Sequence, residues 1–127
     1  MVAEKFEAMV KLGTLNSRMK DLFDVWVLSQ TYDFDGPLLT EAIRTTFARR
    51  QTTISLDPVC FSDPFAGDSS KAVQWKAFVR NGRLVNVPAE FPEVAASVRR
   101  FLLPVVQGIS AVQTRGGAWP RGGPWRS

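Results

Sequence analysis

Two stretches decide the fold: VAEKFEAMVKL at residues 2–12 and SRMKDLFDVWVLSQ at residues 17–30. In both, apolar side chains recur every three or four residues, which is the spacing that lines one face of a helix. Gly13 favours the end of the first helix, and Asn16 or Ser17 suits the cap of the second. The sequence therefore predicts a helical hairpin with a short turn.

The same spacing continues beyond this hairpin. It predicts helices at residues 37–50, 70–80 and 91–106, with Pro37 and Pro92 in first turns and Pro104 as a kink or an end. Residues 51–70 are rich in turn-forming side chains and are predicted to be a loop. The facing stripes of the first three helices are expected to bury Trp26 together with Phe6, Met9, Leu22, Phe23 and Ile43. The expected fold class is all-α, an irregular bundle of about five helices with a disordered C-terminal tail.

The C-terminal tail carries most of the net charge of +4. Residues 114–127 hold three arginines and no acid, so the rest of the chain has 13 basic and 12 acidic residues. The tail repeats Arg-Gly-Gly-Ala-Trp-Pro as Arg-Gly-Gly-Pro-Trp-Arg, a low-complexity pattern typical of disorder. We therefore expect a helical domain at residues 1–108 and a disordered Arg/Gly/Trp/Pro tail at residues 109–127. The body lacks the excess of positive charge typical of nucleic-acid binding.

The absence of histidine and the single cysteine, Cys60, exclude several kinds of site. These kinds are a Cys/His zinc site, a Ser-His or Cys-His catalytic pair and an intrachain disulfide. No segment has the length and apolar character of a membrane span, and the first residues do not resemble a signal peptide. The expected localisation is cytoplasmic, with no membrane partner.

One group of charged residues is a candidate site. Asp21 and Asp24 share a helix face, Lys20 and Asp24 form an i, i+4 pair, and Arg18 can pair with Asp21. The predicted hairpin also brings Lys5 beside Asp21. One interpretation is a solvated face with surface salt bridges, each worth about 0–1 kcal/mol. The other is a cluster facing a cleft, in which Lys5 contacts phosphate oxygens and Asp21 orients it or helps to hold a metal.

Residues 2–10 and 16–26 resemble the AbiEii/AbiGii toxin family of nucleotidyltransferases. In that family an Ala-Glu-Lys segment is followed, after a short loop, by Arg-x-Lys/Arg-Asp-x-x-Asp-Leu/Val. Ala3-Glu4-Lys5 and the run at residues 18–25 match these two parts at the expected spacing. The similarity is concentrated in residues 2–50, and the tail has no counterpart in the pattern.

The resemblance implies a C-terminal helical fragment of a nucleotidyltransferase toxin from a type IV toxin–antitoxin system used in phage defence. Family members transfer a nucleoside monophosphate from an NTP to an acceptor, which for some is RNA. An N-terminal lobe supplies a Gly-Gly/Ser motif and an Asp-x-Asp pair that holds Mg²⁺. By this resemblance the catalytic residues are Lys5 and Asp21, and the nucleotide-binding residues are Lys5, Arg18, Lys20 and Asp24. An AbiEi-type antitoxin is the implied partner.

The chain also departs from the family pattern. No Gly-Gly/Ser motif precedes Lys5, and the only Asp-x-Asp is Asp33-Phe34-Asp35, which we expect in a turn. The chain is therefore expected to be truncated, to hold no metal or other cofactor by itself and to be inactive alone. It would meet nucleic acid only through the RNA acceptor of some family members. The alternative is a stand-alone helical interaction module that binds an antitoxin or a separately encoded catalytic lobe.

Overall fold

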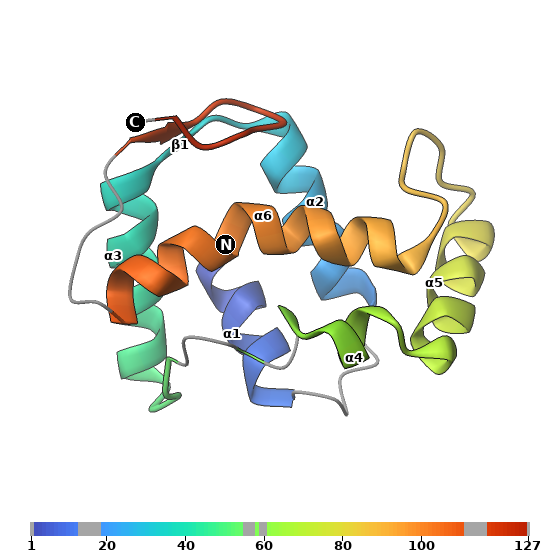
Figure 1. The fold of residues 1–127 in the computed structure, drawn as a ribbon, viewed down its shortest axis with the longest axis horizontal. Coiled ribbons are helices and arrows are strands. Elements are labelled where there is room, and N and C mark those ends of the chain that lie inside the picture. Colours follow the sequence, from blue (N-terminus) through green and yellow to red (C-terminus); the bar gives the residue numbers. More distant parts are fainter. Residues whose placement is uncertain (1, 13–18, 55–57, 59–60, 111–116, 127) are drawn as a thin grey trace.

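The computed structural model describes residues 2–12, 19–54, 58, 61–110 and 117–126, and six helices make up most of this part of the chain (Figure 1). In chain order, the helices are α1 (Val2–Leu12), α2 (Met19–Thr31), α3 (Gly36–Arg49), α4 (Asp63–Ala66), α5 (Ser69–Asn81) and α6 (Phe91–Ser110). Two strands of two residues each, β1 (Phe34–Asp35) and β2 (Ala118–Trp119), pair antiparallel. The fold is predominantly helical, as predicted.

Helix α6 runs through the centre of the molecule, and the other helices pack around it (Figure 1). It contacts α2, α3, α4 and α5. Its apolar residues recur every three or four positions, and eight of them are buried: Phe91, Val94, Ala95, Val98, Phe101, Leu102, Val105 and Val106. The helix continues past Pro104 to Ser110, further than predicted. Within the described ranges no helix combines the length and apolar character that a membrane crossing needs.

The predicted loop at residues 51–70 contains α4, a helix that the sequence analysis missed. The Ser62 side chain caps it by accepting a hydrogen bond from the backbone of Phe65. Phe65 is buried and packs against Phe91 with ring centroids 5.6 Å apart. Burial of one aromatic side chain therefore holds a four-residue helix that has no periodic pattern of its own.

The prediction that Trp26 is buried was wrong. Four of its expected neighbours are buried, namely Phe6, Met9, Leu22 and Ile43, but Trp26 and Phe23 are only partly buried at the edge of the core. Trp75 on α5 is instead fully buried and donates its indole N–H to the carbonyl of Pro88. The reason is that α2 is apolar over more than one face, and periodicity alone does not say which face meets α6.

The prediction of a disordered tail was wrong for residues 117–126, which we call the tail hairpin. Phe34 of β1 lies opposite Trp119 of β2, and Ala118 exchanges two backbone hydrogen bonds of 2.8 Å with Arg126. Figure 1 shows this segment folded back over the end of the helical bundle beside β1. The predicted boundary at residue 108 also falls inside α6.

Two tryptophans fix the tail hairpin to the helices. Trp119 is 4% exposed and donates its indole N–H to the carbonyl of Ser29 at 2.8 Å. Trp125 donates in the same way to the carbonyl of Phe101 at 2.8 Å, and the rings of both stack on or tilt against Phe101. Large aromatic surfaces with satisfied polar ends stabilise a segment whose composition alone indicates disorder.

Gly123 is required where the tail hairpin turns. Its φ is +75°, and a Cβ atom at this position would lie 2.5 Å from the indole ring of Trp119. The backbone therefore packs directly on the Trp119 ring, which only glycine allows.

Candidate functional site

The charged cluster forms where α1 packs against α2. Lys5 Nζ lies 3.8 Å from Asp21 Oδ1, which confirms the predicted approach of these two residues. The ammonium lies closer to Asp24, at 2.8 Å from Oδ2, and Lys20 Nζ reaches the same oxygen at 2.8 Å. Asp24 is thus the centre of the cluster, with one lysine from each helix.

The cluster is partly buried, unlike a salt bridge between two long side chains on the surface. The side chain of Asp21 is 6% exposed, that of Lys5 is 23% exposed, and that of Lys20 is 73% exposed. Lys5 and Asp21 therefore lie in the interface between the helices, while Lys20 lies at its rim. An ion pair removed from water in this way is held more firmly than an exposed pair, because the dielectric around it is lower.

The two lysines keep Asp24 ionised. Burial alone would raise the pKa of its carboxyl, but hydrogen bonds from Lys20 and Lys5 outweigh burial and lower the pKa below its ordinary value. At neutral pH the carboxylate is therefore a fixed negative charge that can orient both ammonium groups.

Arg18, the remaining predicted nucleotide-binding residue, lies outside the described residues. Lys5, Lys20, Asp21 and Asp24 are all brought together. Each of these four positions was predicted from the sequence, although the shorter Lys5–Asp24 contact was not.

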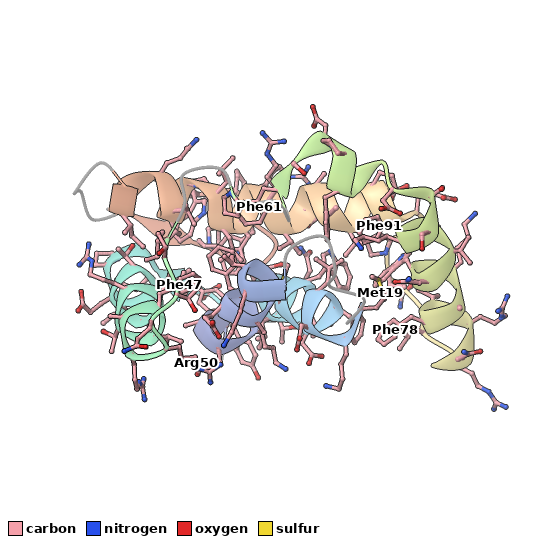
Figure 2. The ribbon with its side chains drawn as sticks, turned by 90° about the horizontal axis from the view of Figure 1, so that it is seen from below. Met19, Phe47, Arg50, Phe61, Phe78 and Phe91 are labelled. Carbon is pink, nitrogen blue, oxygen red and sulfur yellow. The ribbon has the colours of Figure 1, made fainter. Side chains whose placement is uncertain are left out.

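A second polar cluster was missed by the sequence analysis. Glu7 on α1 is 2% exposed, and its carboxylate accepts hydrogen bonds from Arg50 Nη1 at 3.0 Å and Thr52 Oγ1 at 2.6 Å. Burial works to raise the pKa of Glu7, but the hydrogen bonds from Thr52 and Arg50 lower it overall. Figure 2 shows Arg50 at the end of α3, next to α1. This cluster joins α1 to the segment after α3 and has a structural role.

A sequence signal for the Glu7 cluster existed. Glu7 falls four residues after Ala3 and three before Val10, on the apolar side of α1. A carboxylate at such a position needs a hydrogen-bonded cationic or hydroxyl partner, because burying a lone charge is costly. The partner could not be found from the sequence, since it lies more than 40 residues away in the chain.

Both aspartates of the Asp33-Phe34-Asp35 motif make contacts that stabilise the fold. Asp33 accepts a hydrogen bond from the backbone of Arg121 at 2.9 Å and lies 3.6 Å from its guanidinium. Asp35 is the N-cap of α3 and accepts from the backbone of Leu38 at 3.0 Å. In the part of the chain that the structure describes, no three Cys, Asp or Glu side chains gather into a potential metal site.

An apolar groove lies between α1, α2, β1 and the start of α3. Its volume is about 370 Å³, and its lining includes Val2, Leu28, Phe34 and Leu39. Leu38 and Tyr32 stand at its edge and are 73% and 56% exposed. Large apolar side chains that remain exposed around a groove are typical of interaction surfaces.

A model of one protein family matches residues 1–97 of the chain, and its description is "Nucleotidyl transferase AbiEii toxin, Type IV TA system". The matched range contains Lys5, Lys20, Asp21 and Asp24, together with the five helices α1–α5 and the beginning of α6. The tail hairpin lies outside it. No curated protein and no solved structure matches the chain.

Proposed function

Since the chain belongs to the AbiEii family of nucleotidyl transferase toxins from type IV toxin–antitoxin systems, we propose that it forms the helical side of an NTP-binding cleft. The observation that carries the proposal is the contact of Lys5 with Asp24 and Asp21 across the α1–α2 interface. The family pattern has a lysine and an aspartate at these positions. An antitoxin is the expected partner of a protein in such a system.

In this proposal Lys5 contacts the triphosphate, and Asp21 and Asp24 hold its side chain in position. An ammonium group has three donors, and the 2.8 Å contact with Asp24 uses one of them. The other donors are available for phosphate oxygens, for which a compact lysine charge is suited. Because the Lys5 side chain is 23% exposed, a phosphate can approach it without unfolding the helices.

Lys20 adds positive charge at the rim, and the sequence has a further basic residue, Arg18, just before α2. Three basic and two acidic side chains give the group Lys5, Arg18, Lys20, Asp21 and Asp24 a net charge of +1. The Asp24 pKa is lowered, so this balance does not depend on proton uptake near neutral pH. A small net positive charge favours binding of an anionic ligand, and the carboxylates orient the basic side chains that would contact this ligand.

The catalytic metal belongs elsewhere in this proposal. Asp33 and Asp35 do not fit a Mg²⁺ site, because one pairs with Arg121 and the other caps α3. We assign Mg²⁺ binding to a lobe that carries the family's Asp-x-Asp pair and lies outside these 127 residues. The chain is then a fragment that transfers no nucleotide alone.

Radiolabelled NTPs test the proposal. The purified chain with Mg²⁺ should label neither RNA nor protein, and a polypeptide in which the family's catalytic lobe is joined to this chain should label an acceptor. In the joined form Lys5→Met should abolish labelling, while Lys11→Met, an exposed lysine on the same helix, should not. Labelling by the chain alone, or labelling by the joined form that survives Lys5→Met, contradicts the proposal.

The apolar groove favours a second candidate function, a helical module that binds an antitoxin or a separate catalytic lobe. Leu38→Asp places a charge at the groove and should abolish co-purification with an AbiEi-type antitoxin. Val73→Asp is the matched control, because Val73 is a similarly exposed apolar residue on α5 and does not line the groove. Equal binding by both variants would exclude the groove as the contact surface.

A further inference from the structure

A second groove lies on another side of α2, and none of the Lys5 cluster residues lines it. Its volume is about 590 Å³, within the usual range for small-molecule sites. α2 contributes Trp26 and Gln30, α6 contributes Glu93, Ser97 and Arg100, and the tail hairpin closes one end. We call it the Trp26 groove. Asp24 and Trp26 are two residues apart, so they point about 200° apart on α2, and the Lys5 cluster faces away from this groove.

The indole of Trp26 is available for a ligand. Trp75, Trp119 and Trp125 each donate their indole N–H to a backbone carbonyl. Among the described residues, Trp26 donates no such bond. Its ring packs on Phe23 at a centroid distance of 6.5 Å and is only partly buried. The ring is therefore held in place from one side and presents polar and aromatic surface to the groove.

Arg100 is likewise available. It is exposed in the groove and forms no salt bridge within the described part of the chain, whereas its neighbour Arg99 lies 3.8 Å from Asp63. Glu93 lines the same groove seven residues earlier on α6, about 10 Å away along the helix axis, with Ser97 between them. The α6 wall is thus a polar stripe with an acid at one end and a cation at the other.

The residues that line the groove indicate which class of ligand it can bind. A planar ring stacks on Trp26, and an anion binds the guanidinium of Arg100, which prefers phosphate and carboxylate. A nucleotide carries both groups, with its base and its phosphate at opposite ends of a sugar. A base amino group can then donate to Glu93.

We infer that the Trp26 groove binds a nucleoside monophosphate unit, with its base stacked on Trp26 and its phosphate on Arg100. The unit is either a free nucleotide or part of a single-stranded RNA. Both present the same base and phosphate to the groove, so they are distinguished by experiment. The inference does not depend on the role proposed for Lys5.

NMR titration of the full chain with AMP tests the inference. The indole N–H signal of Trp26, assigned with Trp26→Phe, should shift and saturate. Adenosine and inorganic phosphate, titrated separately, should each bind at least about tenfold more weakly, because each lacks one of the two contacts. No shift at millimolar AMP, or equal binding of inorganic phosphate, overturns the inference.

Neighbouring arginines provide a matched pair of variants. Arg100→Gln should weaken AMP binding by about tenfold or more, since a charge-assisted contact is lost, and Arg99→Gln should change it less than about twofold. Equal weakening by the two variants would mean that only general positive charge attracts AMP, and would overturn the inference.

Two further titrations test where AMP binds and whether the ligand is a free nucleotide or part of an RNA. Lys5→Met should leave the Trp26 shift unchanged; loss of the shift would assign AMP to the Lys5 cluster and refute this groove as the site. A short single-stranded RNA with a 5′-phosphate that binds at least about tenfold tighter than AMP identifies RNA as the source. Equal or weaker binding of the RNA identifies the free nucleotide, and either result supports the groove.

Discussion

Lys5 Nζ lies 2.8 Å from Asp24 Oδ2 and joins α1 to α2 through a contact between residues 19 positions apart in the chain. Asp21, which is nearly buried, lies 3.8 Å from the same ammonium. The lysine therefore interacts with two carboxylates at once. Without Lys5, less positive charge would lie near these carboxylates inside the helix interface.

The first prediction follows from this contact. Lys5→Met should lower the free energy of unfolding by about 1–3 kcal/mol, because two partly or nearly buried carboxylates lose the ammonium group that lies between the helices. Lys20→Met should lower it by less than about 1 kcal/mol, since the Lys20 side chain is 73% exposed and its pair with Asp24 is screened by water. Urea denaturation at neutral pH measures both values. Equal losses would mean that Lys5 contributes no more than a surface charge.

Acid should destabilise the protein partly through Glu7. Its pKa is lowered in the folded state, so its contribution to stability is complete above the ordinary carboxyl pKa of about 4.3 and is lost as the pH falls through the lower folded value. Asp24 has a lowered pKa and acts in the same direction. The urea midpoint should therefore fall steeply below about pH 4.3.

Replacement of Glu7 tests its share of that pH dependence. Glu7→Gln cannot titrate, so its urea midpoint should fall less between neutral pH and pH 3 than that of the wild type. Glu41→Gln is the matched control, because the Glu41 side chain is 65% exposed on α3. A Glu7→Gln profile parallel to the wild-type profile would show that Glu7 is not responsible.

The tail hairpin can be tested at two adjacent glycines. Both have positive φ, but only a Cβ at Gly123 would enter the Trp119 ring; at Gly122 the nearest atom is 3.5 Å away. Gly122→Ala should cost about 1–2 kcal/mol from backbone strain, and Gly123→Ala about 2–4 kcal/mol, because strain and overpacking add. Thermal unfolding and near-ultraviolet circular dichroism of the tryptophans measure the difference. If Gly123→Ala proves the milder of the two, the hairpin does not pack as described.

Two tryptophans should differ in their contribution to stability. Trp75 is fully buried, so Trp75→Ala should cost about 3–5 kcal/mol. Trp26 is partly exposed at a groove, so Trp26→Ala should cost only about 1–2 kcal/mol. Chemical denaturation of the two variants provides the comparison. The reverse order would place Trp26 in the core and remove the groove as a binding site.

Helical spacing made most of the fold predictable. It gave the bounds of α1 and, within four residues, those of α2, α3, α5 and α6, because each helix turns regularly spaced apolar residues toward the core. Helix α4 and the tail hairpin could not be found in this way. Both segments are held in place by single aromatic side chains that pack on distant partners, such as Trp119 on Phe101.

The candidate site was predictable to a similar degree. The spacing of Asp21 and Asp24 and the expected hairpin placed both near Lys5. Which of the two lies closer depends on how far α1 slides along α2, a distance of a few ångströms that no local pattern determines. The Glu7 cluster and the Trp26 groove each combine side chains from segments far apart in the chain, so they became visible only in the folded structure.

The hydrogen bond from Trp119 to Ser29 has a consequence for the order in which the chain folds. It joins residues 90 positions apart. Closing so long a loop costs conformational entropy, and the chain loses this entropy before the contact contributes any stabilising free energy. The α1–α2 pair closes a far shorter loop and can form early. We therefore expect the indole of Trp119 to reach its final environment in the last kinetic phase, after the helices have assembled around α6.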